Sequence, residues 1–525
     1  MKKLLAILLT CVLLASVLSI AAAEDKVVNI GVTSTIATLN PMAMDATEIV
    51  KYSTSLIFLP LLEADSHLNF VPQLAEDITT EDNLTFTIKL RDDAAWSDGT
   101  PVTAQDVEFT LILSADPQCA NISLAMYSVV GVSDDGLIEA NAASIEGIQV
   151  IDDKTLTVTT KYPTALNTFK NNFGRYLLTL PKHVLADVPR DQLMTYEWFN
   201  HPDVISGPYF ISDFDLQHYV HYVANDNYFQ GAPKIKYLNL NVVAPAQMLA
   251  GIQSGEIDLV QQTMGAIPIE DYDAIKALTN VRSVSGTPVT NELIFVNVNN
   301  VSDVRIRQAL LYGMDRATMK EALLGDSGEL VDGFLVSASP YFSEELGVTA
   351  YDAEKAAELV KAAKADGAST DLTWYVSSEE SVWGNAVQYF AAMFEEIGLH
   401  ITIRTVDLAN LMEVVSNAEH DILSVEYTLM PADPYTDIAW LIGGQSEWTG
   451  YTSPATDEAL ALSQSLTDES KVKAQYLVIN QAMQQDAPVI SGWVIGKLGV
   501  VSNRLTGADP DVFGTFINVH QWDVQ

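Results

Sequence analysis

The chain has 525 residues, which is too long for one ordinary hydrophobic core and predicts two or more lobes. Its composition, with 48% hydrophobic and 18% charged residues, excludes a fibrous repeat and a wholly disordered chain. The formal net charge of −40 argues against nucleic acid and anionic membranes as partners, and it favours a soluble surface.

The first 23 residues have the pattern of a secretory signal peptide. Lys2 and Lys3 precede an apolar run at 4–20, and three alanines precede Glu24. The run is short for a membrane span and no basic patch follows it, so we expect export with cleavage after Ala23. Loss of the two lysines would change the net charge from −40 to −42.

The chain contains two cysteines, and one of them lies inside this signal. Cys11 raises the alternative of a lipid anchor, but Thr10 fits poorly before a lipidated cysteine. We therefore expect Cys11 to leave with the signal. Cys119 would then be the only cysteine, and no intramolecular disulfide could form.

Strands and helices are predicted in alternation along the rest of the chain. Period-two apolar patterns indicate half-buried strands, and apolar residues at helical spacing indicate helices. Thr103 and Asp106 have the spacing of a capping box, Asp352 is a suitable N-cap, and Gly398 ends a helical pattern. In chain order, the predicted elements are strands at 85–90 and 156–158, helices at 304–314, 353–364 and 387–397, and a strand at 400–406. This mixture predicts α/β or α+β lobes and not a solenoid.

A series of short motifs, in this order, resembles the extracellular solute-binding proteins of family 5, which serve oligopeptide, dipeptide and nickel ABC importers. The motifs are TLNP at 38–41, VPQLAE at 71–76, WSDGTPVTAQDV at 96–107, SGPY at 206–209, NDNYF at 225–229, GAP at 231–233, SGEID at 254–258, DVRIRQAL at 303–310, MDR at 314–316, YDAEKA at 351–356, DP at 433–434 and GY at 450–451. The resemblance covers the whole mature chain.

The resemblance implies a two-lobe fold of the periplasmic-binding-protein type II (class C), with an extra subdomain inserted in lobe 1. Ligand would bind between the lobes and hinge closure would bury it. The boundaries we expect are a signal peptide at 1–23, lobe 1 at 24–62, 183–286 and 494–525, the inserted subdomain at 63–182, and lobe 2 at 287–493.

The resemblance also indicates where ligand would bind. In peptide binders of the family, an aspartate in the segment that corresponds to 421–434 pairs with the peptide's α-amino group; counted back from Asp433, its position falls on Met430. A thioether cannot pair with an ammonium group, so Glu426 or Asp433 is the alternative source of charge. Main-chain groups near Thr35 would pair with the ligand as a strand does, and aromatic rings would stack on it. The candidate ligand-binding residues are Thr35, Ile36, Trp383, Glu426, Tyr427, Thr428, Met430 and Asp433.

Other patterns in the chain do not predict chemistry. Residues 325–328, GDSG, copy a serine-protease fragment without the context of a triad. His218 and His221 lie three apart in a strand-like pattern, which places them on opposite faces and argues against a zinc site. No nucleotide-binding motif is present, and we expect no cofactor and no catalytic residue.

We therefore predict the substrate-binding component of an ABC importer, a monomer that captures a peptide or similar small solute outside the cytoplasm and delivers it to membrane permease subunits. An oligosaccharide or a nickel chelate stays open as the ligand, and sensing stays open as the role. A secreted hydrolase is the less favoured alternative, because no position singles out a pair of catalytic carboxylates.

Overall fold

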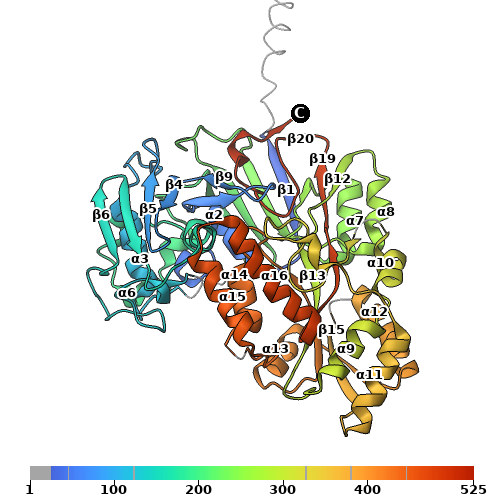
Figure 1. Cartoon of the computed structure of the whole chain (residues 1–525). Coiled ribbons are helices and arrows are strands. Elements are labelled where there is room, and N and C mark those ends of the chain that lie inside the picture. The colour runs from blue at the N-terminus through green and yellow to red at the C-terminus, as the bar shows by residue number, and fades with distance from the viewer. Residues whose placement is uncertain (1–24, 45–46, 122–123, 326–327, 379–380, 445) are drawn as a thin grey trace, which may run out of the picture.

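The computed structural model describes residues 25–44, 47–121, 124–325, 328–378, 381–444 and 446–525. The predicted signal peptide, with Cys11, and residues 326–327 of the GDSG fragment lie outside these ranges. The described chain forms two lobes of mixed strands and helices, as predicted, and each lobe contains a large sheet (Figure 1). In that view lobe 2, with helices α9, α11 and α12, lies below lobe 1.

Lobe 1 is built around a seven-stranded sheet that contains strands from both ends of the chain. In sheet order the strands are β12 (Val281–Ser285), β19 (Leu498–Ser502), β11 (Leu259–Val260), β1 (Val27–Val32), β10 (Tyr237–Val242), β9 (Tyr219–Ala224) and β8 (Tyr209–Asp215). Its helices include α2 (Glu48–Ser55), α7 (Pro245–Ser254) and α8 (Tyr272–Lys276). Two small ladders complete it, β2 (Leu62–Ala64) with β3 (Phe70–Pro72), and β20 (Leu505–Thr506) with β21 (Asp523–Val524).

A four-stranded antiparallel sheet forms the inserted subdomain, at the left of Figure 1. Its strands in order are β4 (Ala75–Thr80), β5 (Thr85–Leu90), β7 (Thr155–Thr159) and β6 (Ile148–Asp152). The helices beside it are α3 (Ala104–Ala115), α4 (Leu166–Phe169), the π-helical turn η3 (Lys170–Arg175), α5 (Lys182–Leu185) and α6 (Arg190–Leu193). The apolar residues of β5 and β7 alternate with polar ones because one face of this sheet packs on the core.

Lobe 2 contains a six-stranded sheet flanked by helices. Its strands in order are β14 (Gly328–Glu329), β18 (Val489–Ile495), β13 (Thr290–Val296), β17 (Ile422–Thr428), β15 (Asp371–Ser377) and β16 (His400–Val406). Its helices are α9 (Val304–Gly313), α10 (Arg316–Leu324), α11 (Ala353–Ala365), α12 (Ser381–Glu396), α13 (Leu408–Ser416), α14 (Pro434–Ile442), α15 (Pro454–Ser465) and α16 (Glu469–Asp486). Strands β13 and β18 are buried along their whole length, since helices and neighbouring strands enclose both.

The six elements predicted from the sequence are all present in the structure. The predicted strands correspond to β5, β7 and β16, and the predicted helices to α9, α11 and α12. Thr103 and Asp106 form the expected capping box, and the Asp352 side chain accepts from the backbone N–H of Lys355. Capping and alternation depend on residues close in the sequence, so they can be predicted without knowledge of tertiary contacts.

Two segments cross between the lobes, 286–289 from β12 to β13 and 496–497 from β18 to β19. They lie against each other: the backbone N–H of Gly286 donates to the carbonyl of Lys497 over 3.0 Å. A Cβ atom added to Gly496 would lie 1.9 Å from the carbonyl oxygen of Gly286. Glycine at 496 therefore permits the close approach of the two segments that form the hinge.

Replacing Gly496 with alanine is expected to force these segments apart and to destabilise the protein by about 1–3 kcal/mol, the usual cost of overpacking. Gly384 in α12 offers a matched control, because a Cβ there meets nothing within 4 Å. Gly384→Ala should be neutral or stabilising by up to about 1 kcal/mol. Thermal unfolding of both variants checks this, and equal melting temperatures would contradict the role of Gly496.

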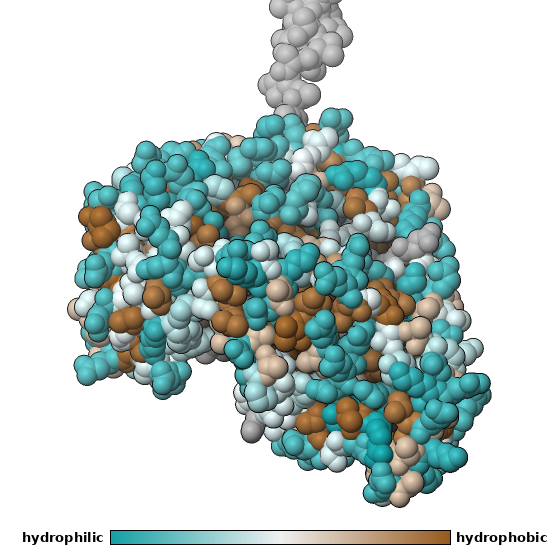
Figure 2. Space-filling model, viewed as in Figure 1, coloured by the Kyte–Doolittle hydropathy of each residue, from teal (hydrophilic) through white to brown (hydrophobic). Residues whose placement is uncertain are grey.

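Figure 2 shows hydrophilic side chains over much of one face, with hydrophobic residues between them in small groups. No helix within the described ranges is long and apolar enough to cross a membrane.

Candidate functional site

A cavity of about 640 Å³ lies between the two lobes. This volume is within the range of about 300–1,000 Å³ that small-molecule sites occupy. Both lobes and the hinge contribute its walls. The lining residues are Thr33, Ser34, Pro245, 262–270 and Tyr272 from lobe 1, Glu292, Ser377, Val382, Trp383, Val425, Glu426, Trp493 and Ile495 from lobe 2, and Lys497 from the hinge.

The lobe 1 wall is formed where two parallel neighbouring strands end. β1 and β11 pair in parallel, so the residues that follow them meet at one edge of the sheet. Thr33 ties the two segments together: its backbone N–H donates to the carbonyl of Met264 over 3.0 Å, and its Oγ1 accepts from the backbone N–H of Ala266 over 3.0 Å. The carboxyl ends of parallel strands are the usual place for ligands in open α/β sheets.

Trp383 dominates the lobe 2 wall. Its ring packs edge-on against Trp493, with centroids 4.7 Å apart, and its Nε1–H donates to Ser424 Oγ over 2.7 Å. A Cβ at Gly492 would lie 2.5 Å from the Trp383 ring, so glycine in β18 leaves the space that the indole fills. The result is a rigid aromatic wall with its polar atom already bonded.

Acidic side chains outnumber basic ones in the cavity. Glu292 and Glu426 lie directly opposite each other on β13 and β17, and Glu270 faces them from lobe 1. Glu426 forms an ion pair with Lys497 of the hinge. The lining thus holds three carboxylates and one ammonium. This excess of acidic over basic side chains favours a ligand group with positive charge.

Only two of the predicted ligand residues line this cavity, Trp383 and Glu426. Thr35 is exposed just beyond the lining residues Thr33 and Ser34. Ile36 is buried in the lobe 1 core, and its backbone N–H donates to the carbonyl of Leu216. Thr428 is exposed at the end of β17 and shares a hydrogen bond of 2.8 Å with Thr290. Their roles in binding stay predictions.

The other three predicted residues lie at a different contact between the lobes. Met430 is buried in an apolar cluster that includes Ala64 and Phe513 of lobe 1 and Val331 of lobe 2. Tyr427 is half-buried, and its hydroxyl donates to Asp437 over 3.0 Å. Asp433 is 2% exposed and bonds to the subdomain. The structure thus places two of the predicted residues in the cavity, three at a closed contact, and Thr35, Ile36 and Thr428 in neither.

Asp437 carries the clearest titration signal in this contact. It accepts from Tyr427 and from the backbone N–H of Met430. Burial raises the pKa of Asp437 and the nearby carboxylates of Asp433 and Glu48 also raise it, while the two hydrogen bonds lower it; the net result is a shift from 3.8 to about 7. The folded protein therefore holds a proton on Asp437 more tightly than the unfolded chain does.

A raised pKa means that Asp437 stabilises the fold fully only below its unfolded value, and that this contribution is lost as pH rises toward 7. We expect the melting temperature to fall from pH 5 to pH 8, and we expect Asp437→Asn to reduce that fall. The exposed Asp152→Asn variant should keep the wild-type difference. Identical pH profiles for wild type and Asp437→Asn would show that this carboxyl does not titrate as described.

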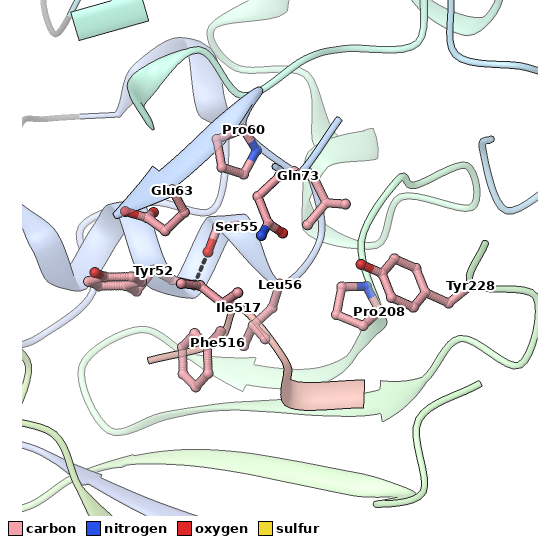
Figure 3. Close-up of a pocket in the computed structure, with 11 residues that line it drawn as sticks. Tyr52, Ser55, Leu56, Pro60, Glu63, Gln73, Pro208, Tyr228, Phe516 and Ile517 are labelled. Atoms are coloured by element: carbon pink, nitrogen blue, oxygen red, sulfur yellow. Dashed lines mark hydrogen bonds between the residues drawn. The ribbon is translucent and has the colours of Figure 1, made fainter. Parts of the chain in front are cut away.

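A cluster of buried charges stands behind this contact in lobe 1. Glu63 forms ion pairs with Lys51 and with Arg175, the latter over 2.6 Å. Figure 3 shows Glu63 beside a small cavity with Tyr52 and Gln73. That cavity has a volume of about 20 Å³, which is room for one water molecule and not for a solute.

Several cavity residues were missed by the sequence reasoning. Thr33 and Ser34 directly precede the predicted residues Thr35 and Ile36. Glu292 is an acid in β13, a strand that is buried along its whole length, and a buried acid is unusual enough to draw attention to this position. Lys497 follows Gly496 where a buried strand ends. The segment 262–270 carries no such signal, because its role depends on which strand β1 pairs with.

The histidines do not form a metal site. Among the residues that the structure describes, no three His, Cys, Asp or Glu side chains are grouped to hold a metal ion. His218 lies just before β9 and pairs with Asp215, whereas His221 stacks on Tyr219 within the strand. The two histidines therefore have separate partners.

Comparison with known proteins agrees with this architecture. Residues 69–448 match the model of the bacterial extracellular solute-binding proteins, family 5 Middle. A putative ABC transporter peptide-binding protein of Brucella ovis is 27% identical over 489 residues, covering 89% of this chain and 86% of the relative.

Solved structures show the same fold. The ABC transporter substrate-binding protein CtaP of Listeria monocytogenes superposes with a TM-score of 0.79 at 22% identity, covering 95% of this chain and all of that one. Lactococcal OppA, complexed with an endogenous peptide in the closed conformation, superposes with a TM-score of 0.75 at 19% identity, covering 93% and 100%. The chain therefore belongs to the bacterial extracellular solute-binding proteins of family 5, the substrate-binding components of ABC importers.

Proposed function

We propose that this chain captures a short peptide in the cavity between its lobes and presents it, unaltered, to membrane permease subunits. The observation that carries the proposal is the cavity of about 640 Å³, which both lobes and the hinge line. A ligand that touches both lobes favours the closed form by its differential contacts, and closure is a change that a transporter can detect.

Three features support a peptide as the ligand. The excess of carboxylates over ammonium groups in the lining favours a protonated α-amino group, with Glu292 and Glu426 nearest to each other across the β13–β17 ladder. Strand ends in lobe 1 offer main-chain groups to an extended backbone. Trp383 and Trp493 provide flat apolar surface for a side chain.

A thermal-shift screen of di- to pentapeptides, oligosaccharides and nickel–histidine tests this, because a bound ligand raises the melting temperature by mass action. We expect peptides to raise the melting temperature. The best peptide should then be compared with its N-acetylated form by calorimetry, and loss of the charged amine should weaken binding by about tenfold or more. A saccharide or nickel chelate scoring in place of peptides, or equal binding of the acetylated peptide, would contradict the proposal.

We also propose that the exported chain acts as a monomer after cleavage at Ala23 and performs no catalysis. Its acidic surface and the signal pattern at 1–23 support this. N-terminal sequencing and light scattering of the secreted protein test cleavage and mass. Turnover of a peptide or oligosaccharide would instead indicate a hydrolase, and response of a receptor in the absence of a permease would indicate sensing.

A further inference from the structure

Asp433 of lobe 2 bonds directly to the inserted subdomain. It is the N-cap residue of α14, and its two carboxylate oxygens face different donors on α4 and η3. Thr168 Oγ1 donates to Oδ1 over 2.7 Å, and Asn171 Nδ2 donates to Oδ2 over 3.0 Å. All three side chains are buried. The carboxylate therefore spans the contact between two bodies that are separate in the fold.

The subdomain side of this contact is held in position by a buried charge. Arg175 Nη1 donates to Asn171 Oδ1 over 3.1 Å, one helical turn along η3. Arg175 is fixed in turn by Glu63, which accepts from its Nε over 2.6 Å. With its oxygen held by Arg175, the Asn171 amide has its N–H aimed at Asp433. The orientation of the Asn171 side chain thus depends on Arg175 and, through it, on Glu63 in the lobe 1 core.

Further hydrogen bonds join the same two surfaces. Asn167 Nδ2 donates to the carbonyl of Ala432 over 3.1 Å, and the backbone N–H of Ala165 donates to Gln464 Oε1 over 3.1 Å. Asn83 Nδ2 donates to the carbonyl of Gln464 over 3.3 Å. Each bond connects the subdomain with α15 or with the residues just before α14 in lobe 2, so opening of the lobes on this side would break all of them together.

Two opposing effects determine how much the Asp433 contact contributes to stability. Asp433 takes its hydrogen bonds from neutral donors, including Thr436 of its own helix at 3.1 Å, and burial raises the pKa of Asp433. A buried carboxylate without a cation is costly, whereas its hydrogen bonds are strong because the acceptor is charged. The two effects oppose each other, so the contact contributes less net stability than its hydrogen bonds alone would give.

We propose that Asp433, Thr168 and Asn171 form a latch that holds lobe 2 on the inserted subdomain and closes the cleft there. None of the three latch residues lines the cavity, although Asp433 follows Glu426 and Met430 on the same segment of lobe 2. The latch therefore sets the closed population independently of the ligand's identity, and it confines the ligand to the cavity beside the hinge.

Spin labels on cysteines at Ile151 in the subdomain and Glu458 on α15 would report opening in the ligand-free protein, since both sites are exposed and the native Cys119 is buried. Asp433→Asn and, separately, Thr168→Val are expected to shift the distance distribution toward longer values. The ratio of open to closed molecules should rise about tenfold, because each change removes a hydrogen bond to a charged group.

Asp332→Asn provides the matched control. Asp332 is a buried carboxylate whose partners, Arg316, Thr349 and Gln484, all lie within lobe 2. The Asp332→Asn variant should have a lower melting temperature than the wild type, but the distance between its spin labels should be unchanged. The latch is refuted if Thr168→Val keeps the wild-type distances, or if Asp332→Asn opens the lobes as far as Asp433→Asn does. All measurements are made without ligand, so failure of peptide binding would leave this result standing.

Discussion

Replacing Glu63 with glutamine is expected to lower the free energy of unfolding of lobe 1 by about 3–5 kcal/mol, the cost of breaking a buried ion pair from one side. Glu63 is the anion between Lys51 and Arg175, and its Oε1 also accepts from the backbone N–H of Ala64 over 2.8 Å. Glutamine keeps the shape but leaves two buried cations with one partner fewer. Urea denaturation, followed by circular dichroism, measures the loss.

The pKa of Glu63 also indicates that its two cationic neighbours stabilise the charged carboxylate. Burial alone would raise it, but Arg175 and Lys51 together hold it below its ordinary value. The matched control is Glu76→Gln, which removes a surface pair with Lys89 in which both side chains are more than half exposed. That change should cost no more than about 1 kcal/mol. Equal losses in the two variants would show that the buried cluster adds no stability.

Trp383→Ala is expected to lower the free energy of unfolding of lobe 2 by about 3–5 kcal/mol and also to weaken ligand binding. The indole is 2% exposed and packs against Phe390 and Trp493 as well as donating to Ser424. Its removal would leave a void in the aromatic wall and merge that void with the cavity. Denaturation measures stability, and calorimetry with the best peptide measures binding.

Trp440 serves as the control for this variant, because it is also a tryptophan of lobe 2 but is 54% exposed. Trp440→Ala should change stability by about 1 kcal/mol or less. If Trp383→Ala keeps its stability and its peptide affinity, then the indole neither supports the wall nor contacts ligand. Loss of stability alone, with affinity intact, would limit Trp383 to a packing role.

Sequence patterns located a segment of the candidate site but did not show which of its residues line the cavity. The sequence predicts the segment 421–434 as one ligand-binding stretch, yet its residues contact different partners. Glu426 points into the cavity, and seven residues later Asp433 begins α14 and meets the subdomain. The turn between β17 and α14 produces this change of direction, and no periodicity in the sequence reveals which residues face lobe 1.

Local sequence patterns are sufficient to predict several of the helices and strands and to indicate the family. Capping at Thr103 and Asp352, alternation in β5 and β16, and the ordered motifs depend on neighbours along the chain, so they can be recognised without coordinates. The residues that share the cavity, and those that join lobe 2 to the subdomain, can be identified only from the tertiary structure. The crossing of glycines 286 and 496, the parallel pairing of β1 with β11, and the meeting of Asp433 with Thr168 each join residues far apart in the chain, and burial and hydrogen bonding between such residues are properties of the folded molecule.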